Sequence, residues 1–353
     1  MKTTVFLGAG ASKPFGYPLT AEILPAIRER LAVEAGLFGG NPVARAAEAR
    51  LKLLLPDVLP GFHDEALELP MITDLLSLID YSLAAGRTLI LGRPAVDLLE
   101  LRTLLDWALL SVIETGDKSG LPAHPLLESF TNWLNSHRGA SGEPIGVIST
   151  NYDIAVERKL FYGFNSHFAV SQAFDFGMRW RDPDQFGLYS PPLQPAYRFY
   201  KLHGSLNWLR CENCEHIYIN TFGAISALAF QQRSQFNTCD CGHALLSTVL
   251  VAPSMVRDVR EPNLLGIWTH ALEQLRTSQD WVIIGYSMPS EDIAIRSLLI
   301  RAYNGAGPVK PRIRIVQRDE SRATLSRYKQ FFPACEYLTG GLEGFLQHAQ
   351  AGL

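Results

Sequence analysis

The stretch Met1-Lys2-Thr3-Thr4-Val5-Phe6-Leu7-Gly8-Ala9-Gly10-Ala11-Ser12 opens the chain and decides which fold to expect. Residues 3–7 are an apolar run with the length and β-branched content of a buried parallel strand. The small residues 8–12 then form a turn that can lead from the strand into a helix. In a nucleotide-binding fold, the glycines of such a turn let the backbone approach a pyrophosphate. A tight turn that binds no ligand would use the same residues, so both interpretations stay open for this motif alone.

Four later runs have the same character and lie at residues 145–149, 198–202, 281–284 and 312–316. Each run is followed at once by small or polar residues. Because the carboxyl ends of parallel strands meet at one edge of a sheet, the residues that follow the five runs should converge on one crevice. Helical patterns alternate with the strands at residues 20–35, 267–279 and 289–302. We therefore predict an α/β fold with a Rossmann-like parallel sheet.

Two segments exceed what the connections of such a sheet require. Helical patterns at 43–54, 71–84, 95–114 and 125–135 fill the long gap between the first two strands, whereas a crossover needs only about a dozen residues. Residues 36–140 are therefore expected to hold an inserted, mostly helical module. Residues 210–243 form a second insertion, and 183–195 is expected to be a loop. We expect a single domain over 1–353 with these two insertions.

The composition is that of an ordinary globular protein. The chain has 353 residues, of which 47% are hydrophobic and 19% charged, and its net charge of −3 gives no signal for a nucleic-acid partner. No stretch approaches the roughly 18 to 20 consecutive apolar residues that span a bilayer. The N-terminal apolar run is too short for a secretory signal. We expect a cytoplasmic protein without a membrane partner.

Four of the five cysteines are clustered in the second insertion. Cys211 and Cys214 form one CxxC pair, and Cys239 and Cys241 form a pair that is one residue shorter. Four thiolates in two close pairs suit a structural, tetrahedral zinc ion, with four protein ligands that leave no open position for catalysis. His216 or His243 could replace a thiolate. Cys335 lies in an apolar run and is expected in the core.

Polar residues at the strand ends are candidates for a site, and each has a structural alternative. Asn151 and Asp153 follow the second strand and could reach a pocket, but either could instead make an Asx-turn or a helix N-cap. His203 could be a general base near neutral pH or a hydrogen-bonded structural histidine. Gly285 and Ser287 could hold a phosphate or simply begin a helix.

In their order along nearly the whole chain, these motifs resemble the sirtuin-like superfamily. They are the GAGxS turn, the Asn and Asp after the second strand, the His-Gly pair, the paired cysteines and the late Gly-x-Ser turn. Segments 148–153 and 284–289 most resemble bacterial sirtuin-like proteins, a group associated with NAD depletion during phage defence. The resemblance implies a sirtuin-like fold, NAD as the co-substrate and zinc as a structural cofactor.

The resemblance also implies a role for each matching residue. Asn151 would position a water or acceptor near the nicotinamide ribose, and His203 would act as the base, so these two are the candidate catalytic residues. Asp153 would belong to the nicotinamide pocket. The other residues implied to contact NAD are Gly8, Ala9, Gly10, Ser12, Gly285, Ser287 and Gln317.

Three departures from the family pattern bear on the activity. Deacylases of this superfamily carry Asp-Phe-Arg soon after the first turn and a Phe-Gly-Glu peptide clamp, whereas this chain has Lys13-Pro14-Phe15-Gly16-Tyr17 and Val251-Ala252-Pro253-Ser254-Met255. Gln317 stands where the family usually has Asn. We therefore expect an NAD glycohydrolase that transfers ADP-ribose to water. An NAD-dependent protein deacylase and a non-catalytic sensor of NAD or ADP-ribose are the alternatives, and a homo-oligomer or a defence-system subunit is a possible partner.

Overall fold

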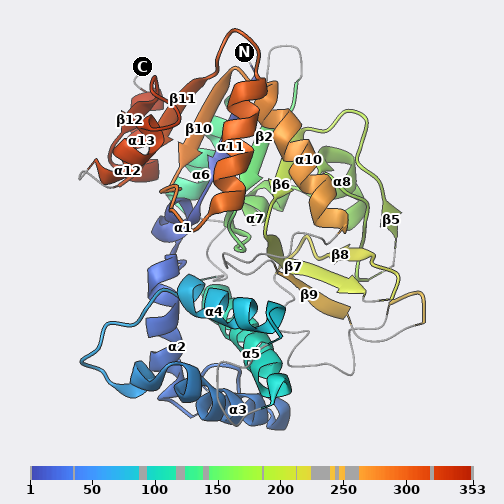
Figure 1. The fold of residues 1–353 in the computed structure, drawn as a ribbon. Helices are drawn as coiled ribbons and strands as arrows, with labels where there is room; N and C mark the ends of the chain where they lie inside the picture. Colours follow the sequence, from blue (N-terminus) through green and yellow to red (C-terminus); the bar gives the residue numbers. More distant parts are fainter. Residues whose placement is uncertain are drawn as a thin grey trace.

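The computed structural model describes residues 2–34, 36–86, 94–116, 124–137, 143–184, 187–211, 213–223, 239–242, 246–250, 262–318 and 322–350. One large cluster of buried hydrophobic side chains runs through the parallel sheet, its covering helices and the helical module. Figure 1 shows the sheet in one half of the molecule and the helices from α2 (Ile23–Leu31) to α5 (Ala95–Glu114) in the other. We call α2–α5 the helical module; it differs from the predicted 36–140 in that α2 belongs to it and residues 125–136 pack with the helices of the sheet instead.

A seven-stranded, fully parallel sheet forms the centre of the fold, with the order β12-β11-β10-β1-β2-β6-β3. All five predicted strands are confirmed, and they are the five inner ones. Inner strands of a parallel sheet are covered on both faces, which is why they read as continuous apolar runs in the sequence. Their bounds are β1 Thr3–Leu7, β2 Ile145–Ser149, β6 Tyr197–Lys201, β10 Asp280–Ile284 and β11 Arg312–Val316, and the edge strands are β3 Phe174–Asp175 and β12 Glu336–Leu338.

The order of the strands creates a switch point between β1 and β10. From β1 the chain goes to β2, then to the edge strand β3, and returns to place β6 between them; it later crosses to the other side of β1 to build β10, β11 and β12. Connections therefore leave β1 and β10 in opposite directions. In open α/β sheets, ligands bind in the crevice outside the carboxyl ends of the strands at such a point.

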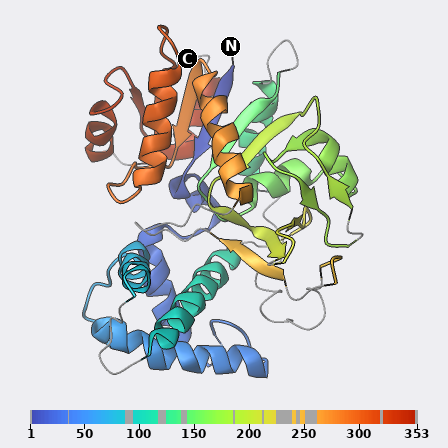
Figure 2. The same ribbon diagram turned by 45° about the vertical axis from the view of Figure 1, so that its right-hand side comes forward.

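Helices cover both faces of the sheet. In Figures 1 and 2, α10 (Pro262–Arg276) and α11 (Ile293–Gly305) lie on one face, and α6 (Pro125–Ser136) packs with α7 (Ala155–Phe161) and α13 (Gly341–Gln350) behind it. The helix predicted at 289–302 begins four residues later than expected. The preceding turn is lengthened by two residues with positive φ, Gly285 and Met288. The remaining short helices of this half are α1 Ala9–Ser12, η1 Lys13–Phe15, α8 His167–Ala173 and α12 Ala323–Lys329.

The helical module lies beyond the carboxyl edge of the sheet. Its helix α5 (Ala95–Glu114) packs against α2, α3 and α4 and buries leucines on the shared side. The predicted helices at 43–54, 71–84 and 95–114 are all present, while 20–35 divides into a 3-10 turn and α2. Among the described helices, we find no segment that is long and apolar enough to span a membrane. The other bounds are η2 Thr20–Glu22, α2 Ile23–Leu31, α3 Pro42–Val58, η3 Pro60–His63 and α4 Ile72–Ala84.

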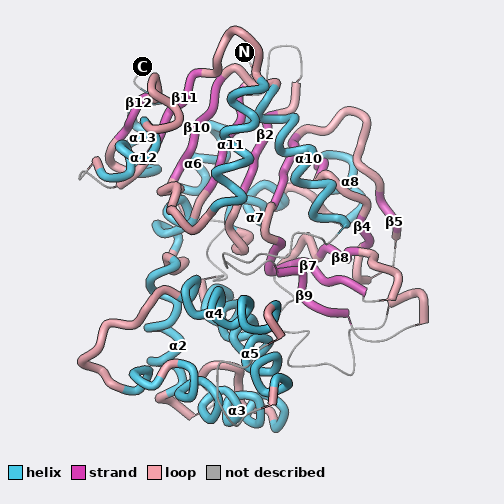
Figure 3. The backbone as a smooth tube through the Cα atoms, viewed as in Figure 1, coloured by secondary structure: helices cyan, strands magenta, loops and turns pink. Residues whose placement is uncertain are grey.

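A second sheet of five strands, which the sequence patterns did not predict, carries the cysteine insertion. Its order is β5-β4-β8-β7-β9 (Figure 3). The chain passes from β6 directly into β7, so the two sheets are joined at His203. The segment 183–195, predicted as a loop, contains the two-residue strand β5. The strands are β4 Trp180–Arg181, β5 Leu188–Tyr189, β7 Gly204–Cys211, β8 Ile217–Ile219 and β9 Leu246–Leu250.

Backbone contact between two glycine turns locks the switch point. The Gly8 N–H donates to the Ile284 carbonyl and the Gly10 N–H to the Gly285 carbonyl, both at 2.9 Å. Gly285 has φ +66, and a Cβ at this position would lie 2.0 Å from the Ala11 nitrogen. A Cβ on Gly8 would lie 2.6 Å from the Cα of Tyr286. The glycines are therefore required by the packing of the turn after β1 against the turn after β10.

We expect Gly285→Ala to destabilise the protein far more than Gly307→Ala. Both glycines have positive φ, but nothing lies within 4 Å of the position of a Cβ on Gly307. In the control, Gly307→Ala, the free energy of unfolding should fall only by the cost of placing alanine in the left-handed conformation, about 1–2 kcal/mol. Gly285→Ala adds a clash with the backbone, so its free energy of unfolding should fall by more than about 3 kcal/mol. Chemical denaturation measures both losses, and equal losses would show that the turn contact is not tight.

Candidate functional site

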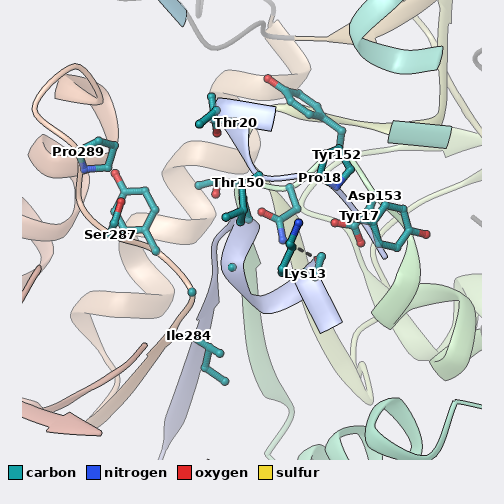
Figure 4. A pocket seen from close by; sticks show the side chains of 18 of the residues that line it. Lys13, Tyr17, Pro18, Thr20, Thr150, Tyr152, Asp153, Ile284, Ser287 and Pro289 are labelled. Atoms are coloured by element: carbon teal, nitrogen blue, oxygen red, sulfur yellow. Dashed lines mark hydrogen bonds between the residues drawn. The ribbon is translucent and has the colours of Figure 1, made fainter. Parts of the chain in front are cut away.

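A cavity of about 460 Å³ lies at the switch point, between the carboxyl edge of the sheet and the helical module. This volume falls in the range of about 300–1,000 Å³ that is typical of ligand sites. Figure 4 shows Ser287 and Pro289 on one side of the cavity and Tyr152 and Asp153 on the opposite side. Met71, from the segment that leads into α4, contributes to the wall on the side of the helical module.

The structure brings the predicted NAD-contacting and catalytic residues together around this cavity. Gly8 does not line the cavity itself, but its carbonyl accepts a hydrogen bond from a residue that does, Asn151. The predicted residues that line the cavity are Ala9, Gly10, Ser12, Asn151, Asp153, His203, Gly285, Ser287 and Gln317.

Asn151 ties the end of β2 to the turn after β1. Its side-chain nitrogen donates to the Gly8 carbonyl at 2.9 Å and to the Ser12 hydroxyl at 3.0 Å. Both amide hydrogens are therefore used inside the protein, and the side-chain carbonyl is the group that Asn151 can offer to a ligand. The residue is buried, so this bridge holds the floor of the cavity in place.

Asp153 makes the structural contact that the sequence left open as an alternative. One carboxylate oxygen accepts a hydrogen bond from the Ala155 N–H at 3.1 Å, at the start of α7. A carboxylate at this position satisfies a backbone donor that the helix leaves unpaired. Because Asp153 also lines the cavity, the helix start fixes the position of a carboxylate there.

His203 is oriented by a hydrogen bond between its Nδ1 and the Thr150 carbonyl, at 3.1 Å. A carbonyl can only accept, so Nδ1 carries the proton and Nε2 has the lone pair of a base. The ring lies between the rings of Tyr152 and Trp268, with centroids 6.2 and 6.3 Å away. His203 is buried, and these neighbours restrict its motion.

The turn after β10 is held by its neighbours in the sheet. The Tyr286 carbonyl accepts hydrogen bonds from the Gln317 side chain at 2.6 Å and from the Tyr328 hydroxyl at 2.8 Å. Arg327 donates to the Ser287 carbonyl at 3.0 Å. The Ser287 side chain itself is exposed at the cavity rim. Gln317 therefore has a structural contact in addition to its place in the cavity wall.

The backbone of the glycine turn offers fewer donors than the motif alone predicts. The N–H groups of Gly8, Gly10 and Ala11 all donate to protein carbonyls, at 2.9 Å each. These three groups are unavailable to a phosphate. A backbone N–H carries only a partial charge in any case, so a full positive charge for a phosphate has to come from a side chain.

Lys201 is a candidate site residue that the sequence patterns missed. It is buried at the end of β6, and its ammonium group donates to the Tyr152 carbonyl, the Asp153 carbonyl and, at 2.5 Å, the Glu157 carboxylate. Burial raises the pKa of Glu157 more than the neighbouring ammonium lowers it. Lys201 thus fixes the backbone of residues 152 and 153 through these hydrogen bonds. In the sequence it lies two residues before His203. The available signal was a lysine that ends a mostly buried strand, in which Arg198 is the one other charged residue.

The four clustered cysteines lie together in the second sheet. Their sulfur atoms are all within 4.8 Å of one another, with Cys211 to Cys241 at 3.7 Å and Cys214 to Cys239 at 3.4 Å. Ligands about 2.3 Å from a tetrahedral zinc ion stand about 3.8 Å apart, so the cluster fits structural zinc despite its shortened second pair. The Nδ1 of His216 lies 3.2 Å from the Cys214 sulfur.

Three further predictions concern residues near this region. Cys335 is buried, as expected, and lies just before β12. His243 lies outside the described residues, as does the segment 251–255 that replaces the family's peptide clamp. The four clustered cysteines are not part of the cavity wall, in keeping with a structural metal.

Comparisons with known proteins found similar folds only among solved structures. No family model matches the chain, and no curated protein matches it. A Sir2 homologue in complex with 2′-O-acetyl-ADP-ribose is 15% identical with a TM-score of 0.43, over 100% of this chain and 93% of that one. A Sir2 homologue in complex with NAD is 14% identical with a TM-score of 0.40, over 99% and 90%. At such values the likeness carries no residue role over to this chain.

We expect the purified protein to contain one zinc ion per chain. Cys214→Ser and Cys241→Ser should each lose the metal, because a tetrahedral site needs all four ligands. Cys335→Ala, which changes a buried cysteine outside the cluster, should keep it. Elemental analysis checks the metal content, and removal by a chelator should lower the melting temperature. Full zinc content in both Ser variants would contradict the assignment.

We also expect the buried pair Lys201–Glu157 to behave as a coupled unit. Lys201→Met should cost about 3–5 kcal/mol, because it leaves a buried carboxylate without its partner. Combining it with Glu157→Leu should cost clearly less than the two single losses added together. Chemical denaturation of the wild type, the two single variants and the double variant gives the coupling free energy of the pair. Additive losses of stability would show that the two charges do not depend on each other.

Proposed function

We propose that this protein binds NAD in the cavity and cleaves the bond between nicotinamide and ribose, with water as the acceptor. The observation that supports this most strongly is the convergence of Asn151, Asp153 and His203 on one cavity beside the turn after β1. An amide, a carboxylate and an oriented imidazole base at a sheet switch point form a set that can bind a nucleotide and activate water.

In this proposal NAD lies across the switch point. Its pyrophosphate lies at the turn after β1, and its adenosine half extends toward Ser287 and Gln317. Its nicotinamide half extends toward Asp153 and His203. Two observations support this arrangement. Figure 4 shows Ser287 and Asp153 on opposite sides of the cavity, and β10 and β11 lie on one side of β1 in the sheet, whereas β2 and β6 lie on the other.

For this reaction the protein has to position NAD and water and to provide one general base. The bond between the ribose carbon and the nicotinamide nitrogen breaks, its electron pair stays on the ring, and neutral nicotinamide leaves. The ribose then resembles an oxocarbenium ion, as in other glycosidic cleavages. Water attacks this carbon, its proton goes to Nε2 of His203, and the Asn151 carbonyl orients the water. The products are ADP-ribose and nicotinamide.

Water is favoured over an acylated lysine because the sequence lacks the deacylase motifs at 13–17 and 251–255. A deacylase with the same site would transfer ADP-ribose to an acyl oxygen instead. A sensor would bind NAD or ADP-ribose and release no nicotinamide. We further propose that the hydrolase depletes NAD in antiviral defence, a role for which the sequence resemblance is the support.

We expect His203→Asn to lower kcat for NAD cleavage by about 10²- to 10⁴-fold, the usual contribution of a general base. The new amide can still donate to the Thr150 carbonyl but lacks a base at the position of Nε2. His348→Asn is the control, since the Nδ1 of His348 also contacts a backbone carbonyl, that of Gly344, but His348 itself is exposed and does not line the cavity. Asn151→Ala removes the carbonyl that orients the water and should abolish cleavage.

The assay incubates each variant with NAD, with and without an acetylated peptide, and separates the products by chromatography. Free ADP-ribose without peptide supports the hydrolase, whereas acetylated ADP-ribose formed only with peptide supports the deacylase. ADP-ribose binding by calorimetry and the melting temperature show whether each variant keeps its fold. Wild-type turnover in folded His203→Asn and Asn151→Ala would refute the site.

A further inference from the structure

Lys13 follows the glycine turn directly and is held by a carboxylate at the cavity. Its ammonium group contacts both carboxylate oxygens of Glu22, at 2.5 and 2.6 Å. Glu22 also accepts a hydrogen bond from the Leu19 N–H at 2.7 Å, so the pair closes the loop 14–21. Burial acts to raise the pKa of Glu22, but the hydrogen bonds from Lys13 and Leu19 lower it overall. Figure 4 shows Lys13 beside the turn.

The cavity has few other sources of positive charge. Among the described residues that line it, the side chains with a full positive charge are Lys13 and Arg318. Arg318 follows β11, which is two strands away from β1. Strands are spaced about 4.8 Å apart, so Arg318 starts about 10 Å from the glycine turn. Lys13 is the cation closest to that turn in the sequence.

The turn itself supplies little compensation for a phosphate. The N–H groups of Gly8, Gly10 and Ala11 are already paired with protein carbonyls. A pyrophosphate carries two negative charges, and a lysine ammonium is a common point-charge partner for phosphate. A ligand placed here therefore needs a side-chain cation.

We propose that Lys13 is the cation that binds the pyrophosphate of the dinucleotide, and that Glu22 competes with the ligand for it. This inference rests on the proposed function. Both side chains are part-exposed, at 38% for Lys13 and 44% for Glu22. An ion pair so close to solvent contributes little, and Lys13 can exchange it for a doubly charged ligand at small cost. Glu22 keeps Lys13 beside the turn until the ligand arrives.

Two variants at the same ion pair should have opposite effects. Lys13→Met removes the cation and should weaken ADP-ribose binding about tenfold. Glu22→Gln frees the cation, while its amide oxygen still accepts from the Leu19 N–H, and should tighten binding. Lys52→Met is the matched control, since Lys52 is 41% exposed and pairs with Glu48 away from the cavity wall.

Calorimetry with ADP-ribose at two salt concentrations measures these effects, and melting temperatures confirm folding. Binding to Lys13→Met should depend less on salt than binding to the wild type. If both Lys13→Met and Glu22→Gln weaken binding, the pair only shapes the loop and this inference is wrong, while the proposed function stands. If Lys13→Met binds as tightly as the wild type, the inference is likewise wrong. Failure of the wild-type protein to bind ADP-ribose refutes the proposed function together with this inference.

Discussion

The contact between the turn after β1 and the turn after β10 is the constraint on which the rest of the site depends. Gly285 lies against the backbone of Gly10 and Ala11, where no side chain fits. Because these turns leave neighbouring parallel strands, their contact fixes the floor of the crevice at the switch point. The helical module and the 151–153 segment then complete the walls around a fixed floor.

Several residues around the cavity combine a structural contact with a position in its wall. The Asn151 side chain donates to the Gly8 carbonyl, and the Asp153 carboxylate accepts from the first N–H of α7. The Gln317 side chain donates to the Tyr286 carbonyl. For Asp153 and His203, the structural contact that competed with a binding role is thus present, and the same contacts orient the groups that remain for a ligand. Lys201 adds a buried charge beneath the 151–153 segment. These contacts hold the side chains of Asn151, Asp153 and His203 in place without a ligand, which is the condition that catalysis by positioning would require.

The sequence predicted the parts of the fold that repeat a strong pattern. The five inner strands were found to within one residue, because burial on both faces leaves uninterrupted apolar runs. Within the second sheet, β4 and β5 escaped prediction because they have two residues each and show no periodicity. The convergence of Asn151 and His203 followed from their positions directly after two parallel strands, whereas the Lys201–Glu157 and Lys13–Glu22 pairs depend on side-chain geometry that no local pattern encodes.

In the proposed function, one dinucleotide lies across the switch point, between the glycine turns and His203. A crystal structure of the protein soaked with ADP-ribose tests this placement most directly. We expect the pyrophosphate beside residues 8–12, the adenosine toward Ser287, and the distal ribose within hydrogen-bonding distance of His203. ADP-ribose bound elsewhere, with this cavity empty at saturating ligand, would refute the placement.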